Sequence, residues 1–145
     1  MGKLTVTTFV SLDGVMQAPG GPTEDPIDGF PHGGWGVPHF DQSTGMFMAG
    51  VFARAEAFLL GRRTYDIFAS YWPKVTEPGN PVADALNRLP KHVASTRLRE
   101  LSWPGSRLLD GDVPTAIRRL KEQYTGELQV HGSCGLLQTL WQHDL

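Results

Sequence analysis

The pattern of apolar and polar positions alternates short strands with helices along most of the chain. Strand-like runs, either alternating or briefly apolar and β-branched, occur at residues 3–10, 56–61, 91–96, 106–109 and 127–132. Apolar residues at helical spacing predict helices over residues 39–55, 62–72, 81–89, 111–124 and 133–145. This alternation predicts an α/β fold built in layers around a largely parallel sheet.

Two helices have clear inward faces. In residues 111–124, Asp112 can cap the helix, Pro114 lies in its first turn, and an apolar stripe runs from Val113 through Ile117 and Leu120 to Tyr124. In the last helix, the spacing predicts that four apolar side chains face the core: Leu136, Leu137, Leu140 and Trp141.

A long segment rich in glycine and proline, residues 15–38, separates the first strand from the first helix. A loop of this length inside a compact domain is usually functional or mobile. A functional loop would place Phe30, His32 and Trp35 against a flat ring and would decide the substrate. A tolerated surface insertion fits the sequence equally well.

Composition narrows the classes of function. The 145 residues predict one domain, residues 1–145, and the net charge of −2 argues against a nucleic-acid-binding protein. The single cysteine, Cys134, excludes an intrachain disulfide bond. No signal peptide, membrane-spanning run or metal-ligand pattern is recognised, so we expect a cytoplasmic protein with a small-molecule partner.

Two arginines open the helix at residue 62, where the partial positive charge of a helix N-terminus disfavours cations. The stretch Gly61-Arg62-Arg63-Thr64 offers a close backbone approach, N–H groups, a hydroxyl and positive charge, which together indicate an anion site. The alternative is an ordinary solvated helix start whose arginines pair with acids elsewhere.

Two further turns extend the anion hypothesis. Ser95, Thr96 and Arg97 follow a strand and suit a phosphate, although an ordinary polar turn would look the same. Gly132, Ser133 and Gly135 permit a tight turn close to a pyrophosphate, although a glycine-assisted helix cap is the simpler reading. Because strand ends gather ligands in parallel sheets, the three turns together indicate a phosphorylated dinucleotide.

The same motifs carry a resemblance to a known family. The stretches VSLDG, LLGRRTYDIF, VASTRL, LLDGDVPTAIRRLKE and LQVHGSCGLLQTL follow one another as in the dihydrofolate reductase-like superfamily. They resemble most closely the reductase domain of the bacterial riboflavin-biosynthesis deaminase/reductase. The zinc deaminase signatures of the complete riboflavin enzymes are absent.

The resemblance implies a three-layer α/β/α fold, NADPH as cofactor, and hydride transfer to a small heterocyclic or sugar-linked substrate. Phosphate contacts are implied for residues 61–64, contacts to the 2′-phosphate for residues 95–97, and backbone contacts to nicotinamide for Phe9 and Val10. Gly132, Ser133, Gly135 and Leu136 would line the pyrophosphate and nicotinamide side. The family continues with C-terminal strands and commonly dimerises, so we expect either a shortened form or strands supplied by a partner in a homodimer.

A reductase also needs a proton source when its product gains a proton. Asp13, in the SLDG turn, and Asp41, at the start of the first helix, are the candidate catalytic residues. A turn cap and a helix N-terminal acid, respectively, are the alternatives. A non-catalytic nucleotide- or phosphate-binding module and a true dihydrofolate reductase remain as alternative functions.

Overall fold

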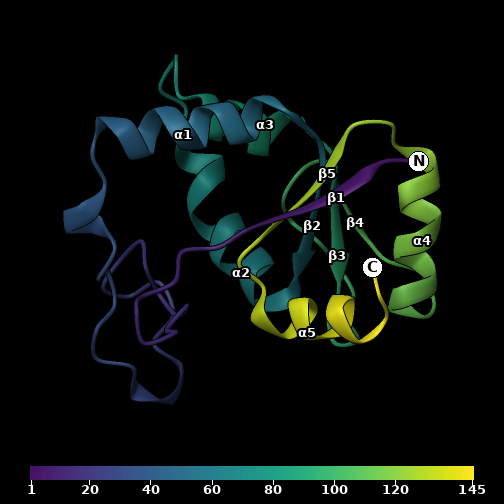
Figure 1. The fold of residues 1–145 in the computed structure, drawn as a ribbon, viewed down its shortest axis with the longest axis horizontal. Helices are drawn as coiled ribbons and strands as arrows, with labels where there is room; N and C mark the ends of the chain where they lie inside the picture. The colour runs from purple at the N-terminus through teal and green to yellow at the C-terminus, as the bar shows by residue number, and fades with distance from the viewer.

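A computed structural model describes residues 1–145 as a five-stranded sheet covered by helices on both faces (Figure 1). The strands are β1 (Lys3–Thr7), β2 (Ala55–Gly61), β3 (Lys91–Ala94), β4 (Ser106–Leu108) and β5 (Glu127–His131). The helices are α1 (Gln42–Ala53), α2 (Arg62–Tyr71), α3 (Pro81–Arg88), α4 (Val113–Gln123) and α5 (Cys134–Gln142). No helix is both long enough and apolar enough to cross a bilayer.

The strand order is β1-β5-β2-β3-β4, and every neighbouring pair is parallel. This confirms the predicted α/β layers and makes the sheet parallel throughout. The last strand, β5, lies between the first two, where Leu128 and Val130 are fully buried. The carboxyl ends of β1, β5, β2 and β3 therefore lie along one edge of the sheet.

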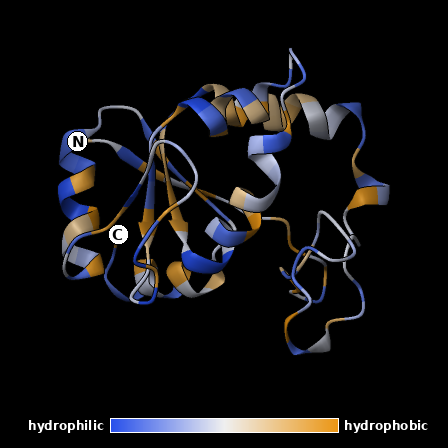
Figure 2. Ribbon diagram, turned by 180° about the vertical axis from the view of Figure 1, so that it is seen from behind, coloured by the Kyte–Doolittle hydropathy of each residue, from blue (hydrophilic) through white to orange (hydrophobic).

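The sheet buries a separate apolar core on each face. Phe58 and Leu60 of β2 pack with residues of α1, α2 and α3, whereas the alternating Ala57 and Leu59 pack with residues of α4 and α5. Figure 2 shows apolar residues concentrated in the strands and on the inward sides of the helices. Both faces of β2 are thus covered, as a central parallel strand requires.

The predicted helix caps are present, with one correction to an inward face. Asp112 accepts a hydrogen bond from the Thr115 N–H and caps α4. In α5, Leu136 and Leu140 are buried, but the side chain of Trp141 is 89% exposed, so the prediction that Trp141 faces the core is wrong. Leu136 and Leu140 are four residues apart on one helix face, and the next position turns away from it.

The segment from residue 8 to residue 41 forms a lobe beside α1 and α2 (Figure 1). Two short 3-10 turns, Ile27–Gly29 and Val37–His39, are its only regular elements. Gln17 organises the interior of the lobe. Its side-chain amide donates to the backbone carbonyls of Asp25 and Ile27, and its backbone carbonyl accepts from the Trp35 indole N–H. The predicted long loop is therefore internally hydrogen-bonded.

Candidate active site

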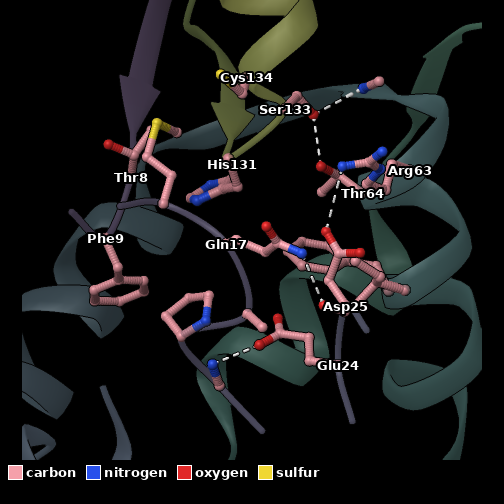
Figure 3. A pocket seen from close by; sticks show the side chains of 18 of the residues that line it. Thr8, Phe9, Gln17, Glu24, Asp25, Arg63, Thr64, His131, Ser133 and Cys134 are labelled. Atoms are coloured by element: carbon pink, nitrogen blue, oxygen red, sulfur yellow. Dashed lines mark hydrogen bonds and ion pairs between the residues drawn. The ribbon is translucent and has the colours of Figure 1, made fainter. Parts of the chain in front are cut away.

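A cavity of about 1640 Å³ opens at the carboxyl edge of the sheet (Figure 3). Residues that directly follow β1, β2 and β3 line it, together with His131 at the end of β5 and the start of α5. The lobe between β1 and α1 supplies another wall, from Gly14 to Asp25. Ligand pockets for drug-sized molecules measure about 300–1,000 Å³, so this cavity has room for a larger ligand or for two ligands.

Two of the helices that start at this cavity, α2 and α5, differ from the other helices in their N-terminal capping. Side chains of Asp41, Asn80 and Asp112 cap α1, α3 and α4. No side chain caps α2, which begins after Gly61, or α5, which begins after Ser133. The first N–H groups of both helices are thus left without a capping side chain beside the cavity, where they can bind an anion.

Ser133 connects these two helix starts. Its Oγ accepts a hydrogen bond from the Gly61 N–H at 2.9 Å and donates one to Thr64 Oγ1 at 2.8 Å. A Cβ on Gly61 would lie 3.2 Å from Ser133 Oγ, so glycine permits this close approach. Both Gly132 and Ser133 have positive φ angles, 60° and 61°. Gly132 therefore serves the backbone conformation of the turn, because a Cβ at this position would meet only Thr64 Oγ1, at 3.7 Å.

The two arginines of α2 are paired with carboxylates. Arg62 bonds Asp66 at 2.8 Å, one helical turn later, and Arg63 lies 3.5 Å from the buried carboxylate of Asp25 in the lobe. Both arginines therefore pair with acids in this structure, as the alternative to an anion site predicted. Their positive charge next to the cavity is partly neutralised before any anion arrives.

Arg97 is the exposed cation at the cavity that has no acidic partner. The Ser95 hydroxyl accepts from the N–H groups of Arg97 and Leu98, which fixes the turn after β3. Thr96 lines the cavity beside them. This turn therefore offers a guanidinium and hydroxyl groups to a phosphate without first breaking an ion pair.

His131 is a cavity residue that no motif in the sequence identified. The residue is 5% exposed, its ring stacks on Phe52 with centroids 4.4 Å apart, and its Nε2 is 3.1 Å from Gln129 Oε1. Burial lowers the pKa of His131 to about 4, so the ring is neutral near pH 7. Its place near the end of the strand predicted over residues 127–132 was the available signal, because strand ends face ligands in parallel sheets.

Most of the residues predicted to contact a cofactor line this one cavity. They are Phe9, Gly61, Arg62, Arg63, Thr64, Ser95, Thr96, Arg97, Gly132, Ser133, Gly135 and Leu136. Val10 does not line the cavity and is half-exposed. The turns at residues 61–64, 95–97 and 132–136, which are far apart in the sequence, thus lie around one cavity.

The two predicted proton donors lie outside the cavity lining. Asp13 is exposed, and a hydrogen bond from Ser11 Oγ lowers its pKa. Asp41 is also exposed; hydrogen bonds from the Thr44 N–H and hydroxyl lower its pKa, as expected for a helix cap. The structure does not bring either carboxylate together with the residues predicted to bind the cofactor.

The aromatic residues predicted to stack on a substrate are also placed elsewhere. Phe30, His32 and Trp35 do not line the cavity, and Phe30 and His32 pack against each other with ring centroids 5.8 Å apart. Phe9 and Phe40 line it instead, with centroids 4.9 Å apart. The lobe contributes to the cavity through these two rings at its ends and through residues 14–25.

Comparison with protein families gives one match, to the family described as the RibD C-terminal domain, over residues 2–145. A search of curated proteins finds no match. The family match covers nearly the entire chain and confirms the resemblance drawn from the motifs, including the dihydrofolate reductase-like fold.

Proposed function

The chain belongs to the RibD C-terminal domain family, and on that basis we propose that it is an NADPH-dependent reductase. The proposed reaction transfers a hydride to a small heterocyclic or sugar-linked substrate. It resembles the reduction of 5-amino-6-(5-phosphoribosylamino)uracil in riboflavin biosynthesis. The observation that carries the proposal is the pair of helix starts without side-chain caps, α2 and α5, side by side at a cavity of about 1640 Å³.

The residues present fit a phosphorylated dinucleotide. The first N–H groups of α2 and α5 would bind the pyrophosphate, with Thr64 Oγ1 as an additional donor because it accepts from Ser133 and keeps its own proton. Arg97 and Ser95 would bind the 2′-phosphate, which distinguishes NADPH from NADH. When bound, the cofactor supplies the hydride.

The other end of the cavity suits an uncharged ring. Phe9, Phe40 and His131 line it, and the buried His131 ring is neutral at physiological pH. Flat apolar and aromatic walls with a few polar atoms are typical of heterocycle sites. This end would hold the substrate ring and exclude water from it, while the phosphate-binding turns hold the cofactor.

A nucleotide-binding module without catalysis is the second candidate. The observation that favours it is the position of Asp13 and Asp41, both exposed and outside the cavity lining. The acid that does line the cavity in a buried position, Asp25, faces Arg63. In a reductase the proton would then come from water.

Two measurements in sequence test the proposal. Titration of the protein with NADPH, followed by its fluorescence, should show saturable binding that is tighter than for NADH. NADPH oxidation at 340 nm against a panel of pterins and aminouracils should then reveal turnover. Binding without turnover on any substrate would favour the module, and absence of NADPH binding would overturn the reductase.

A further inference from the structure

His131 is held in a fixed orientation at the point where β5 meets the cavity. Phe52 stacks on one face of its ring at an interplanar angle of 14°, and Phe58 lies tilted against it with centroids 5.7 Å apart. Figure 3 shows the ring among the side chains that line the cavity, in the same view as Thr8, Phe9 and Gln17. With aromatic rings around it, the imidazole cannot turn freely.

Gln129 fixes which nitrogen of His131 carries the proton. The Gln129 Nε2 donates to the Val51 carbonyl and to Glu127 Oε2, both at 2.8 Å. These partners only accept, so the amide cannot be turned around, and its Oε1 must be the atom that faces His131. His131 Nε2 therefore donates to Gln129 Oε1, and the neutral ring keeps its lone pair on Nδ1.

The second ring nitrogen is left for a ligand. Nδ1 of His131 has no hydrogen-bond partner in the protein. Among fully enclosed side-chain nitrogen and oxygen atoms, only Ser106 Oγ lacks a partner, so Nδ1 must keep some accessible surface. Because His131 lines the cavity, this surface opens toward a bound ligand. An acceptor left unpaired at such a depth is costly unless a ligand or water donates to it.

We propose that Nδ1 of His131 accepts a hydrogen bond from an N–H group at the ring end of the bound ligand. Two donors share this chemistry: the carboxamide of a nicotinamide cofactor, and a ring N–H group of a heterocyclic substrate. His131 is then a specificity-determining residue, and Gln129 is a positioning residue that acts through it. The inference rests on the proposed reductase function, and it specifies that the site selects a ligand with an N–H donor at its ring end.

Four probes separate the two donors. NADPH carries the carboxamide, and its 3-acetylpyridine analogue carries a methyl ketone instead; 5,6-diaminouracil carries ring N–H groups, and its 1,3-dimethyl derivative does not. In His131→Phe, which keeps a ring against Phe52 but loses both nitrogens, the probe that uses this contact should bind about tenfold more weakly. The matched probe that lacks this group, either the 3-acetylpyridine analogue or the 1,3-dimethyl derivative, should bind equally well to the wild type and to His131→Phe.

A matched control uses the other buried histidine of the sheet. His92 bonds Tyr124 Oη at 2.8 Å through its Nε2 and does not line the cavity, so His92→Phe should leave all four affinities unchanged. Unchanged affinity of His131→Phe for every probe that the wild type binds would overturn the inference and leave the reductase proposal intact. A wild-type protein that binds none of the probes would overturn both.

A measurement on the unsubstituted protein guards against a variant that fails to fold. With ¹⁵N-labelled histidine, the ring nitrogens of His131 should show a protonated Nε2 and an unprotonated Nδ1 at pH 7. Addition of the N–H-bearing probe should shift the Nδ1 resonance upfield, and the matched probe should not. A protonated Nδ1 in the free protein, or the same response to both probes, would contradict the inference.

Discussion

The hydroxyl of Ser133 donates a hydrogen bond to Thr64 Oγ1 at 2.8 Å, across 69 residues of sequence. The same oxygen accepts from the Gly61 N–H, so one side chain joins the start of α5 to the start of α2. Both helix starts border the cavity, and neither has a side-chain cap of its own. The spacing between the two proposed pyrophosphate-binding turns therefore depends on Ser133.

Replacing Ser133 by alanine should lower both stability and cofactor affinity. The change leaves the Gly61 N–H without its acceptor, which should reduce the free energy of unfolding by about 1–2 kcal/mol. NADPH affinity should fall because the two turns lose their connection. Chemical denaturation and NADPH titration measure the two effects. Ser43→Ala, which removes an exposed hydroxyl of α1 outside the cavity lining, is the control and should change neither quantity.

Arg97→Ala should reduce the preference for NADPH over NADH. Arg97 is the exposed cation at the cavity without an acidic partner, and one charge-assisted hydrogen bond contributes about 1.5–3 kcal/mol. NADPH should therefore bind about ten- to a hundredfold more weakly, with NADH unaffected. Calorimetric titration with both cofactors measures the ratio. The nearby Arg99→Ala serves as the control, and an unchanged ratio in Arg97→Ala would exclude this residue from the 2′-phosphate site.

Asp25→Asn should release Arg63 for anion binding. The two side chains are 3.5 Å apart, with Asp25 buried and Arg63 half-exposed, so a bound phosphate competes with the carboxylate for the guanidinium. Since partly exposed ion pairs are worth about 0.5–1 kcal/mol, NADPH affinity should rise roughly two- to fivefold. The lobe should also become more sensitive to limited proteolysis. Asp28→Asn, in the same lobe but exposed, should do neither; weaker NADPH binding by Asp25→Asn would contradict the prediction.

Stability should fall in acid partly because of His131. Burial lowers its folded pKa to about 4, whereas the ordinary value is 6.5, so the unfolded chain binds more protons between these values. The stabilisation is complete above pH 6.5 and is lost progressively as the pH falls toward 4, by up to about 3 kcal/mol. Burial also lowers the pKa of His92, which acts in the same direction.

Urea unfolding of the wild type and of His131→Phe between pH 4 and pH 7 isolates this contribution. The difference in unfolding free energy between the two proteins should shrink or reverse as the pH falls. Only the wild type carries an imidazole at this position, and protonation of that ring in acid favours the unfolded chain. A difference that does not change with pH would show that His131 titrates normally in the folded protein.

We also propose that the chain forms a homodimer. Trp141 at the end of α5 is 89% exposed, and Met46 and Phe47 of α1 are also largely exposed. Exposed apolar groups of this size favour association. Sedimentation at low micromolar concentration should therefore show a dimer, and Trp141→Ser should weaken it if α5 forms the interface. Leu12→Ser, in a different exposed turn, is the control; a wild-type monomer at this concentration would contradict the proposal.

Patterns local in sequence predicted most of the fold. The helix from Val113 to Gln123, its Asp112 cap and the strand–helix alternation follow from apolar spacing and cap residues that lie within a few positions of one another. The first strand ends at Thr7 rather than Val10, because β5, its neighbour, ends at His131 opposite Thr7. Strand ends depend on a partner distant in sequence, so they were the least predictable feature.

Details of the candidate site depended on contacts that the sequence does not encode locally. Arg63 is paired with Asp25, 38 residues earlier in the lobe, and no spacing rule links the two. His131 gave no periodic signal of its own, although its place at a strand end was predicted. Trp141 was misassigned because four apolar residues close together in a short helix do not identify which of them turns away from the core.

The position of β5 also determines when the sheet can form on the ribosome. β1 pairs with β5 alone, in a register that joins Lys3 to Glu127 and Thr7 to His131. At about 5–20 residues per second, the first strand therefore waits on the order of ten seconds for its neighbour to be synthesised. During this interval the edge of β2 that pairs with β5 has no partner strand. Nascent chains should accordingly depend on chaperones until the residues of β5 have left the ribosome.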